Sequence, residues 1–223
     1  MLDTQQDTRK RRFAPREVRR QQLIEATLDA LAENGVSGTT MAAVTQRAGL
    51  SMGIVSLHFQ SKANLLTSTL RYLAEEIRDA WADIHLDAAL SATDRLRGIV
   101  DASFDENISS PVKMRVWFAF FGEARYRQVY RDMVEDFDEE RIDAIEELCA
   151  QIAQDGGYDD VCPKTLAATI ECLCDGVWLS MILYPDWMTS AGAKAQVMDV
   201  VARHFPRHFQ LTAPKTCAKG TPT

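Results

Sequence analysis

The sequence lacks several features that mark whole classes of protein. Its 223 residues contain no apolar run close to the ~18 residues of a membrane-spanning helix. The first residues, MLDTQQDTRKRRF, lack the apolar segment of a secretory signal. Strand-forming patterns are almost missing, and no internal repeat or low-complexity region occurs. These absences predict an all-α protein of the cytoplasm.

Residue patterns that would indicate an enzyme or a metal site are also missing. The five cysteines are an odd count without zinc-type spacing, because Cys172 and Cys174 would diverge on a helix. His204 and His208 lie four residues apart near a helix end and are only a weak sign of a metal site. No nucleophile–base pair and no glycine-rich phosphate loop is present. We therefore predict no enzyme activity, no cofactor, no metal, and reduced thiols.

Negative charge predominates along the chain except in one segment. The net charge is -7, yet residues 9–20 carry seven basic side chains against Glu17 alone, a balance of +6. The rest of the chain therefore totals -13. Such a run is often a solvated tail, but this one leads directly into the first predicted helix, where it could contact phosphates.

Residues 40–62, TMAAVTQRAGLSMGIVSLHFQSK, predict two short helices joined by a tight turn. Thr40 and Ser51 are suited to begin the helices, and Gly49 can adopt the left-handed backbone that ends the first one. Val55 and Phe59 lie on the buried side of the second helix. Two short helices with a glycine turn form the unit that places its second helix in the DNA major groove.

The remaining sequence predicts further helices and two folded domains. A first helix from Pro15 to about Asn34 precedes the helix pair, and the others cover about 61–84, 92–107, 111–125, 126–155, 163–184 and 190–209. This pattern predicts a three-helix N-terminal helix-turn-helix domain over 15–60 and a larger helical domain over 61–210. Residues 1–14 are expected to form a basic flexible arm, and 211–223 a disordered tail.

The helix pair resembles the TetR family of bacterial transcriptional repressors. The residues that carry this resemblance are Thr40, Val44, Ala48, Gly49, Leu50, Ser51, Gly53, Val55, His58, Phe59, Ser61 and Lys62. The sequence departs from the family pattern at Thr45, where alanine is usual, and at Leu57, where a polar or aromatic residue is common. The stretches 104–106, 114–125 and 174–179 are similar to the choline-responsive BetI subfamily, whose members regulate the glycine betaine pathway.

The resemblance implies which residues meet DNA. With Val55 and Phe59 buried, the outward positions of the second helix are those that contact DNA in the family; they are Ser51, Met52, Gly53, Ser56, Leu57 and His58. Met52 or Leu57 could touch a thymine methyl group, Ser56 a base edge or a phosphate, and His58 a phosphate. Thr40 and Lys62 are further phosphate candidates. Without Arg or Asn on this surface, much of the affinity should come from phosphates.

The resemblance also implies a small-molecule inducer, choline. Aromatic side chains can hold quaternary ammonium groups against their ring faces, and carboxylates can balance the charge. The aromatic candidates are Trp117, Phe118, Phe121 and Trp178, and the acidic ones are Asp105, Glu123 and Asp175. Aromatic residues at helical spacing are more often core residues, and Asp175 could instead lie at a dimer contact.

The last two helices resemble the pair that forms the family's homodimer. Their apolar positions, expected to build a four-helix bundle, are Ala167, Ala168, Ile170, Leu173, Val177, Met181, Val197, Val200, Val201 and Phe205. A two-fold dimer would present two recognition helices to a palindromic operator in double-stranded DNA. Alternatives are a regulator of an efflux or metabolic operon with a different hydrophobic ligand, and a design in which the ligand is required for DNA binding.

Overall fold

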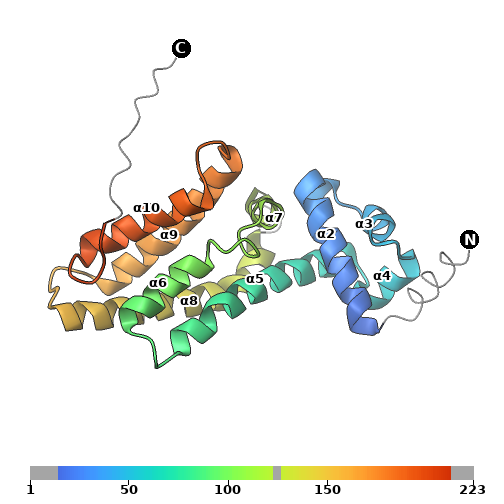
Figure 1. Ribbon diagram of the computed structural model, residues 1–223. Coiled ribbons are helices and arrows are strands. Elements are labelled where there is room, and N and C mark those ends of the chain that lie inside the picture. Colours follow the sequence, from blue (N-terminus) through green and yellow to red (C-terminus); the bar gives the residue numbers. More distant parts are fainter. Residues whose placement is uncertain (1–14, 123–126, 212–223) are drawn as a thin grey trace, which may run out of the picture. The chain divides into compact units, whose positions relative to one another are not determined.

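The computed structural model describes residues 15–122 and 127–211, and within these ranges the chain forms helices and no strand (Figure 1). The helices are α2 (Arg16–Gly38), α3 (Met41–Ala48), α4 (Met52–Phe59), α5 (Lys62–Leu86), α6 (Ala92–Ala102), α7 (Pro111–Gly122), α8 (Arg127–Gly156), α9 (Pro163–Leu183) and α10 (Ser190–His204). The all-α prediction is confirmed. The predicted arm over 1–14, Glu123 and nearly all of the predicted tail lie outside the described residues.

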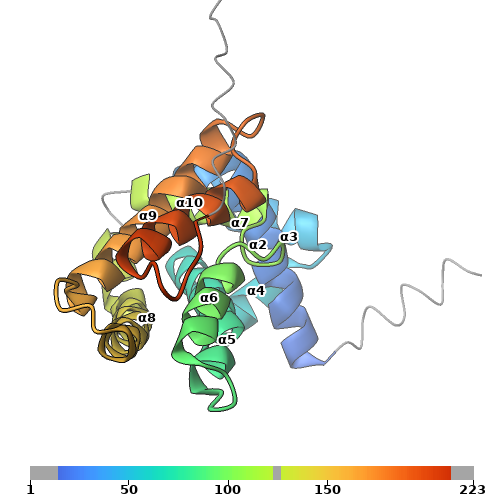
Figure 2. The same ribbon diagram turned by 60° about the vertical axis from the view of Figure 1, so that its left-hand side comes forward.

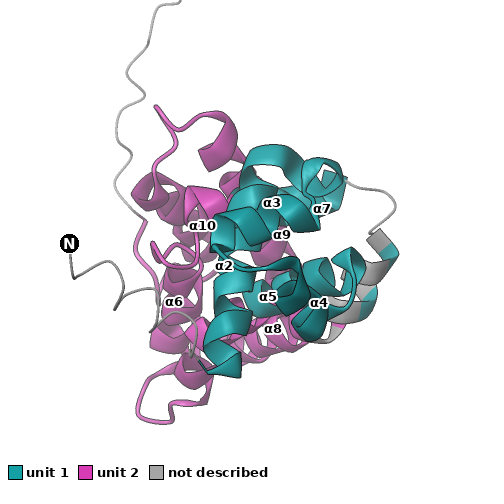
Figure 3. Cartoon of the chain, turned by 90° about the vertical axis from the view of Figure 1, so that its right-hand side faces the viewer, with its two compact units in different colours: residues 1–73, 115–133 teal, residues 74–114, 134–223 magenta. Residues whose placement is uncertain are grey.

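The chain divides into two compact units, coloured separately in Figure 3. Unit 1 comprises residues 1–73 and 115–133, and unit 2 comprises residues 74–114 and 134–223. Helix α5 begins in unit 1 and ends in unit 2, so it is a continuous covalent connection between them.

In unit 1, α2 packs against α3 and α4 around a small apolar core. Leu23, Ile24 and Val44 are fully buried there. The backbone of α2 breaks at Gly35, whose φ of 65° lies in the left-handed region, as expected for a residue that stops a helix. The following segment returns to Thr39, which donates hydrogen bonds from both its backbone N–H and its hydroxyl to the Gly35 carbonyl.

The turn between α3 and α4 follows the sequence pattern closely. The Thr40 hydroxyl accepts a hydrogen bond from Ala43 N at 3.1 Å and so caps α3. Gly49 adopts φ 64° and ψ 33°, the left-handed conformation that ends α3. Ser51 occupies the N-cap position of α4, but its side chain makes no capping hydrogen bond. The predicted helix start is thus confirmed, while its side chain does not cap the helix.

In unit 2, α10 packs against both α9 and α6, and α9 and α10 lie side by side in Figures 1 and 2. The core between them includes Leu96, Ile170 and Val197, all fully buried. Two helices are shorter than predicted, since α6 ends at Ala102 and α10 at His204. Helix α9 is long and apolar enough to cross a membrane by length and composition alone, a property that it shares with core helices of soluble proteins.

Several apolar residues expected at a dimer interface are instead buried within the protomer. Those with no more than 3% exposure are Ala167, Ile170, Val177, Val197, Val201 and Phe205. They face inward because α9 packs against α10, and α10 against α6, within one chain. The outward face of α9 carries other residues, among them Ala168, Cys172, Gly176, Leu179 and Leu183.

Candidate DNA-binding surface and effector site

One side of helix α4 is buried in the core of unit 1, and the other side is exposed to solvent. Val55 is fully buried and Phe59 is 3% exposed, so these two side chains hold the helix in the core of unit 1. On the outer side, Met52 is 46% and Leu57 69% exposed. Ser51, Gly53 and Ser56 are exposed as well, while His58 is half-buried. The structure therefore places the predicted DNA-contacting residues of α4 on one accessible surface, with His58 at its edge.

Lys62 has a partner within the protein. Its ammonium group, at the first residue of α5, donates a hydrogen bond to the Val36 carbonyl oxygen at 3.0 Å. This contact ties the start of α5 to the segment that follows the break in α2. An ammonium group has three N–H donors, so two remain for another acceptor. This contact could not be predicted from the sequence, because the two residues are 26 positions apart.

Basic side chains of α2 lie close to α4. The Arg20 guanidinium sits over the Phe59 ring, 5.7 Å from its centroid. Arg19 is buried and donates to Gln22, whereas Arg16 is exposed. Partial burial, and then the charge of Arg16, lower the pKa of His58 below its ordinary value. Both effects disfavour a positive charge on His58 in the free protein.

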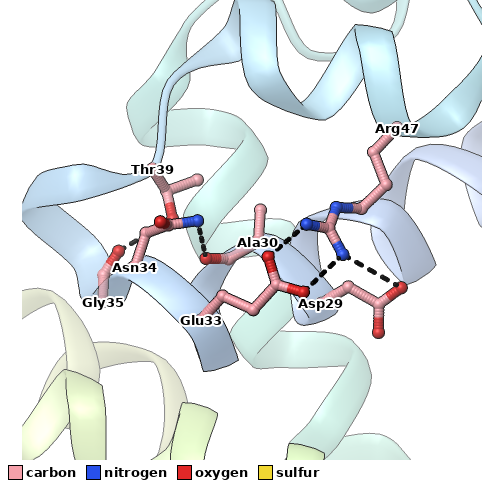
Figure 4. Close-up of polar contacts among 7 residues, drawn as sticks. All are labelled: Asp29, Ala30, Glu33, Asn34, Gly35, Thr39 and Arg47. Atoms are coloured by element: carbon pink, nitrogen blue, oxygen red, sulfur yellow. Dashed lines mark hydrogen bonds and ion pairs between the residues drawn. The ribbon is translucent and has the colours of Figure 1, made fainter.

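Helix α3 is braced against α2 by Arg47, a residue that the sequence did not single out (Figure 4). Its guanidinium donates to both carboxylate oxygens of Glu33 and also lies 3.8 Å from Asp29. The hydrogen bond to Arg47 lowers the pKa of Glu33. The pair is solvent-exposed, so its contribution to stability is small, but its two-pronged geometry fixes the orientation of α3.

The predicted aromatic candidates of α7 lie together in unit 1. Trp117 is buried, and its ring lies edge-on to that of Phe121, with centroids 6.3 Å apart. Phe118 is half-buried, and its ring centroid lies 5.7 Å from that of Phe121. These three residues form one aromatic cluster on a single helix.

The remaining predicted ligand residues lie in unit 2 or outside the described residues. Asp105 is exposed in the loop after α6, where its carboxylate accepts a hydrogen bond from Asn107 N at 2.8 Å and shapes the loop. Asp175 and Trp178 lie one turn apart on α9. The Trp178 indole is buried and donates to the Ser103 carbonyl oxygen at 3.0 Å. Glu123 is not among the described residues.

A buried arginine, missed by sequence reasoning, lies at the centre of an acidic cluster on α8 and α9. Arg141 is 9% exposed and donates to Glu171 at 2.9 Å and to the Ser103 hydroxyl at 2.7 Å. Asp138 precedes it by one turn on α8, and Asp175 follows Glu171 by one turn on α9. We call Asp138, Arg141, Glu171 and Asp175 the Arg141 cluster. The spacing of Glu171 and Asp175 in an apolar segment was the available sequence signal.

The Arg141 cluster has more negative than positive groups. Burial and the charges of Glu171 and Asp175 raise the pKa of Asp138 to about 7. Asp175 is solvent-exposed, yet the atoms packed beside its carboxyl group, and then Glu171, raise its pKa to about 6. Fully ionised, three carboxylates and one guanidinium leave a net charge of -2. The cluster therefore favours an added proton or cation.

Comparison with known proteins settles the family of this chain. Residues 23–69 match the model of bacterial regulatory proteins of the tetR family, and residues 92–206 match that of the C-terminal domain of BetI-type transcriptional repressors. The chain belongs to the TetR family. Within this family, its C-terminal part is of the BetI type, as the sequence resemblance implied.

Relatives in the TetR family cover most of the chain. The HTH-type transcriptional regulator BetI of Paraburkholderia phymatum is 38% identical over 175 residues, which are 77% of this chain and 85% of that protein. The BetI regulator of Escherichia coli K12 is 33% identical over 202 residues, 85% and 95% of the two chains. These relatives are transcriptional regulators, and this TetR-family chain is likewise a DNA-binding regulator and not an enzyme.

Solved structures share the TetR fold. A putative transcriptional regulator from Pseudomonas aeruginosa PAO1 superposes with a TM-score of 0.75 at 23% identity, covering 90% of this chain and 97% of that one. FadR from Bacillus subtilis, in complex with stearoyl-CoA, gives a TM-score of 0.67 at 16% identity and covers 82% and 97%. At these identities the similarity concerns the fold alone.

Proposed function

We propose that this TetR-family repressor binds a palindromic operator as a homodimer in the cytoplasm and is released by choline or another quaternary ammonium compound of the glycine betaine pathway. The excess of carboxylates in the Arg141 cluster is the observation that supports a cationic ligand. Operator binding is supported by the surface of α4, and the homodimer by the outward face of α9.

The operator part follows from the side chains of the α4 surface. They include no Arg or Asn, so they offer few donors for base edges, and their phosphate candidates are Thr40, His58 and Lys62. The exposed Arg16 and the Arg20 that stacks on Phe59 add positive charge beside this surface. We expect affinity to depend strongly on salt, because phosphate contacts release counterions.

The homodimer is supported by the outward face of α9. Small residues at 168, 172 and 176 would let a second helix approach closely, and Leu179 and Leu183 are 41% and 57% exposed. Light scattering of the purified chain should give twice the mass of one chain. Leu179→Glu should yield monomers, whereas Leu86→Glu, at a leucine 74% exposed at the end of α5, should leave the mass unchanged. A monomeric wild-type protein would overturn the dimer.

A quaternary ammonium ligand suits the Arg141 cluster for two reasons. Its positive charge would favour ionisation of the carboxyl groups, which reach a net charge of -2 with Arg141 when all three are ionised, and its methyl groups would suit a neighbouring aromatic face such as that of Trp178. Trp117, Phe118 and Phe121 are further aromatic candidates. Glycine betaine carries its own carboxylate, so it should bind more weakly than choline beside these acids.

Calorimetry with choline, glycine betaine and the neutral isostere of choline, in which carbon replaces the ammonium nitrogen, tests this proposal. Choline should bind and the isostere should not. Asp175→Asn should weaken choline binding about ten-fold or more, the equivalent of ~1.4 kcal/mol. Asp143→Asn removes a charge from the exposed side of α8 and should leave choline affinity unchanged. If none of the three compounds binds, the choline proposal fails.

Release from DNA would follow from a shift between two populations of the dimer. A ligand that binds better when the two recognition helices have a spacing unsuited to the operator would favour that state. Helix α5 is the covalent path for this shift, since it runs from unit 1 into unit 2.

The second candidate is a TetR-family regulator of an efflux or metabolic operon that responds to a different hydrophobic ligand. The aromatic cluster of Trp117, Phe118 and Phe121, whose rings lie edge-on or tilted to one another, favours it, because aromatic surface suits an uncharged apolar molecule. This candidate predicts that a neutral hydrophobic compound stabilises the protein thermally and that choline does not. If Phe121→Leu abolished this thermal stabilisation, the ligand would be assigned to this aromatic cluster.

A further inference from the structure

Leu57 is the most exposed apolar side chain on the α4 surface. It is 69% exposed, although leucine is normally buried, and the core of unit 1 is completed on this helix by Val55 and Phe59. It is also a departure from the TetR-family pattern at this position. The core of unit 1 therefore does not use the Leu57 side chain, which is accessible to a partner on the α4 surface.

The residues that share one face of α4 with Leu57 offer no side chain that could recognise a partner by hydrogen bonds. We call this face the Leu57 stripe. Gly53 precedes Leu57 by four residues and so lies on the same stripe, and a side chain at Gly53 would meet only the Ser51 hydroxyl, 3.8 Å away. Within α4 this stripe has no hydrogen-bonding side chain, and the next polar residue, Gln60, follows the end of the helix. The parallel stripe carries Met52 and Ser56, and the hydroxyl groups of this surface belong to Ser56 and to Ser51 at the start of the helix. Leu57 can recognise a partner only through apolar contact.

The surroundings of Leu57 favour a polyanion. After burial, the charges of Arg16 and Arg20 lower the pKa of His58, the residue next to Leu57, while Glu17 opposes them, so two positive charges and one negative charge lie near Leu57. Two large exposed apolar side chains on α4, Met52 and Leu57, are too few for a stable protein interface, which needs about 800 Å² from each partner. Double-stranded DNA combines negative charge with an apolar group in its major groove, the 5-methyl group of thymine.

We propose that Leu57 is a specificity-determining residue that reads the 5-methyl group of one thymine in each operator half-site by apolar contact. This inference rests on the proposed operator binding through α4. Because the stripe lacks donors and acceptors, the methyl group alone is read at this position. Any base pair with a methyl group in the same place, including 5-methylcytosine paired with guanine, should satisfy Leu57.

The test begins with selection of tight-binding duplexes by the full chain from a pool with a randomised centre. In the enriched duplex, each thymine is then replaced by deoxyuridine, which lacks only the methyl group. At one thymine per half-site, this change should weaken wild-type binding about four-fold, the equivalent of ~0.8 kcal/mol for one buried methyl group. Replacement of the same base pair by cytosine–guanine should also weaken binding, and 5-methylcytosine should restore it.

The matched variants are Leu57→Ala and Met52→Ala, both at exposed positions of α4. Leu57→Ala should bind the thymine and deoxyuridine duplexes equally, whereas Met52→Ala should keep the difference at that position. Equal discrimination by wild type and Leu57→Ala would overturn the inference, as would wild-type binding that no deoxyuridine affects. A wild-type chain that enriches no duplex would overturn operator binding itself and the Leu57 inference with it.

Discussion

Replacing Lys62 by methionine separates two roles of one ammonium group. The substitution keeps the aliphatic part of the side chain and removes the hydrogen bond of 3.0 Å to the Val36 carbonyl oxygen. Val36 is 1% exposed, and a half-buried hydrogen bond from a charged donor contributes about 1–2 kcal/mol. We expect Lys62→Met to lower the free energy of unfolding by that amount, measured by urea titration followed by circular dichroism.

The same variant should bind DNA more weakly in a way that does not depend on sequence. If each Lys62 of a dimer also contacts one phosphate, the slope of log affinity against log salt should fall by about 0.9 per lysine, or about 1.8 in total. Fluorescence anisotropy over a range of salt concentrations measures this slope. Lys194→Met is the control, because Lys194 pairs with Asp101 within unit 2 and should leave the slope unchanged.

Two results would refute this reasoning. Unchanged stability of Lys62→Met would show that the contact with Val36 contributes nothing measurable. An unchanged dissociation constant, or a weaker one with an unchanged slope, would show that Lys62 does not touch a phosphate.

Two further variants test the described contacts. Because the pKa of Asp138 is raised from 3.8 to about 7, the folded protein holds a proton that the unfolded chain has released between these values, so stability falls as pH rises through this window. Asp138→Asn should therefore stabilise the protein by on the order of 2–4 kcal/mol at pH 8 and little at pH 4, and equal urea midpoints at pH 8 would contradict the raised pKa. Gln60 adopts φ 62° and ψ -38° in a tight turn in which Ser61 N donates to Phe59 O. Gln60→Gly should raise the free energy of unfolding by about 1 kcal/mol, and a destabilised variant would show that no strain is relieved.

The helix-turn-helix could be predicted from sequence because its determinants are local. A capping hydroxyl at Thr40, a left-handed glycine at 49 and the buried Val55 and Phe59 each act within a few residues of one another. The starts of several other helices follow from the same kinds of signal, whereas the ends of α6 and α10 were predicted too late. Pro111 and Pro163 begin helices, and Ser61 caps α5 through Asn64 N.

Contacts between distant segments could not be predicted in the same way. Arg141 and Glu171 meet only because α8 and α9 pack together, and neither helix shows this in its own sequence. The pairing of Arg47 with Glu33 depends likewise on how α3 lies against α2. The inward direction of Val197 and Val201 was missed because apolar spacing shows that a helix has a buried face, but not whether its own chain or a second copy covers that face.

Release of DNA by the ligand can be measured directly. The wild-type chain is bound to a fluorescent duplex enriched by selection, and choline or its neutral isostere is added while anisotropy is recorded. We expect choline to lower the anisotropy to that of free DNA and the isostere to leave the complex intact. A complex that persists or tightens at saturating choline, or that the isostere releases equally well, would contradict a repressor released by a quaternary ammonium ligand.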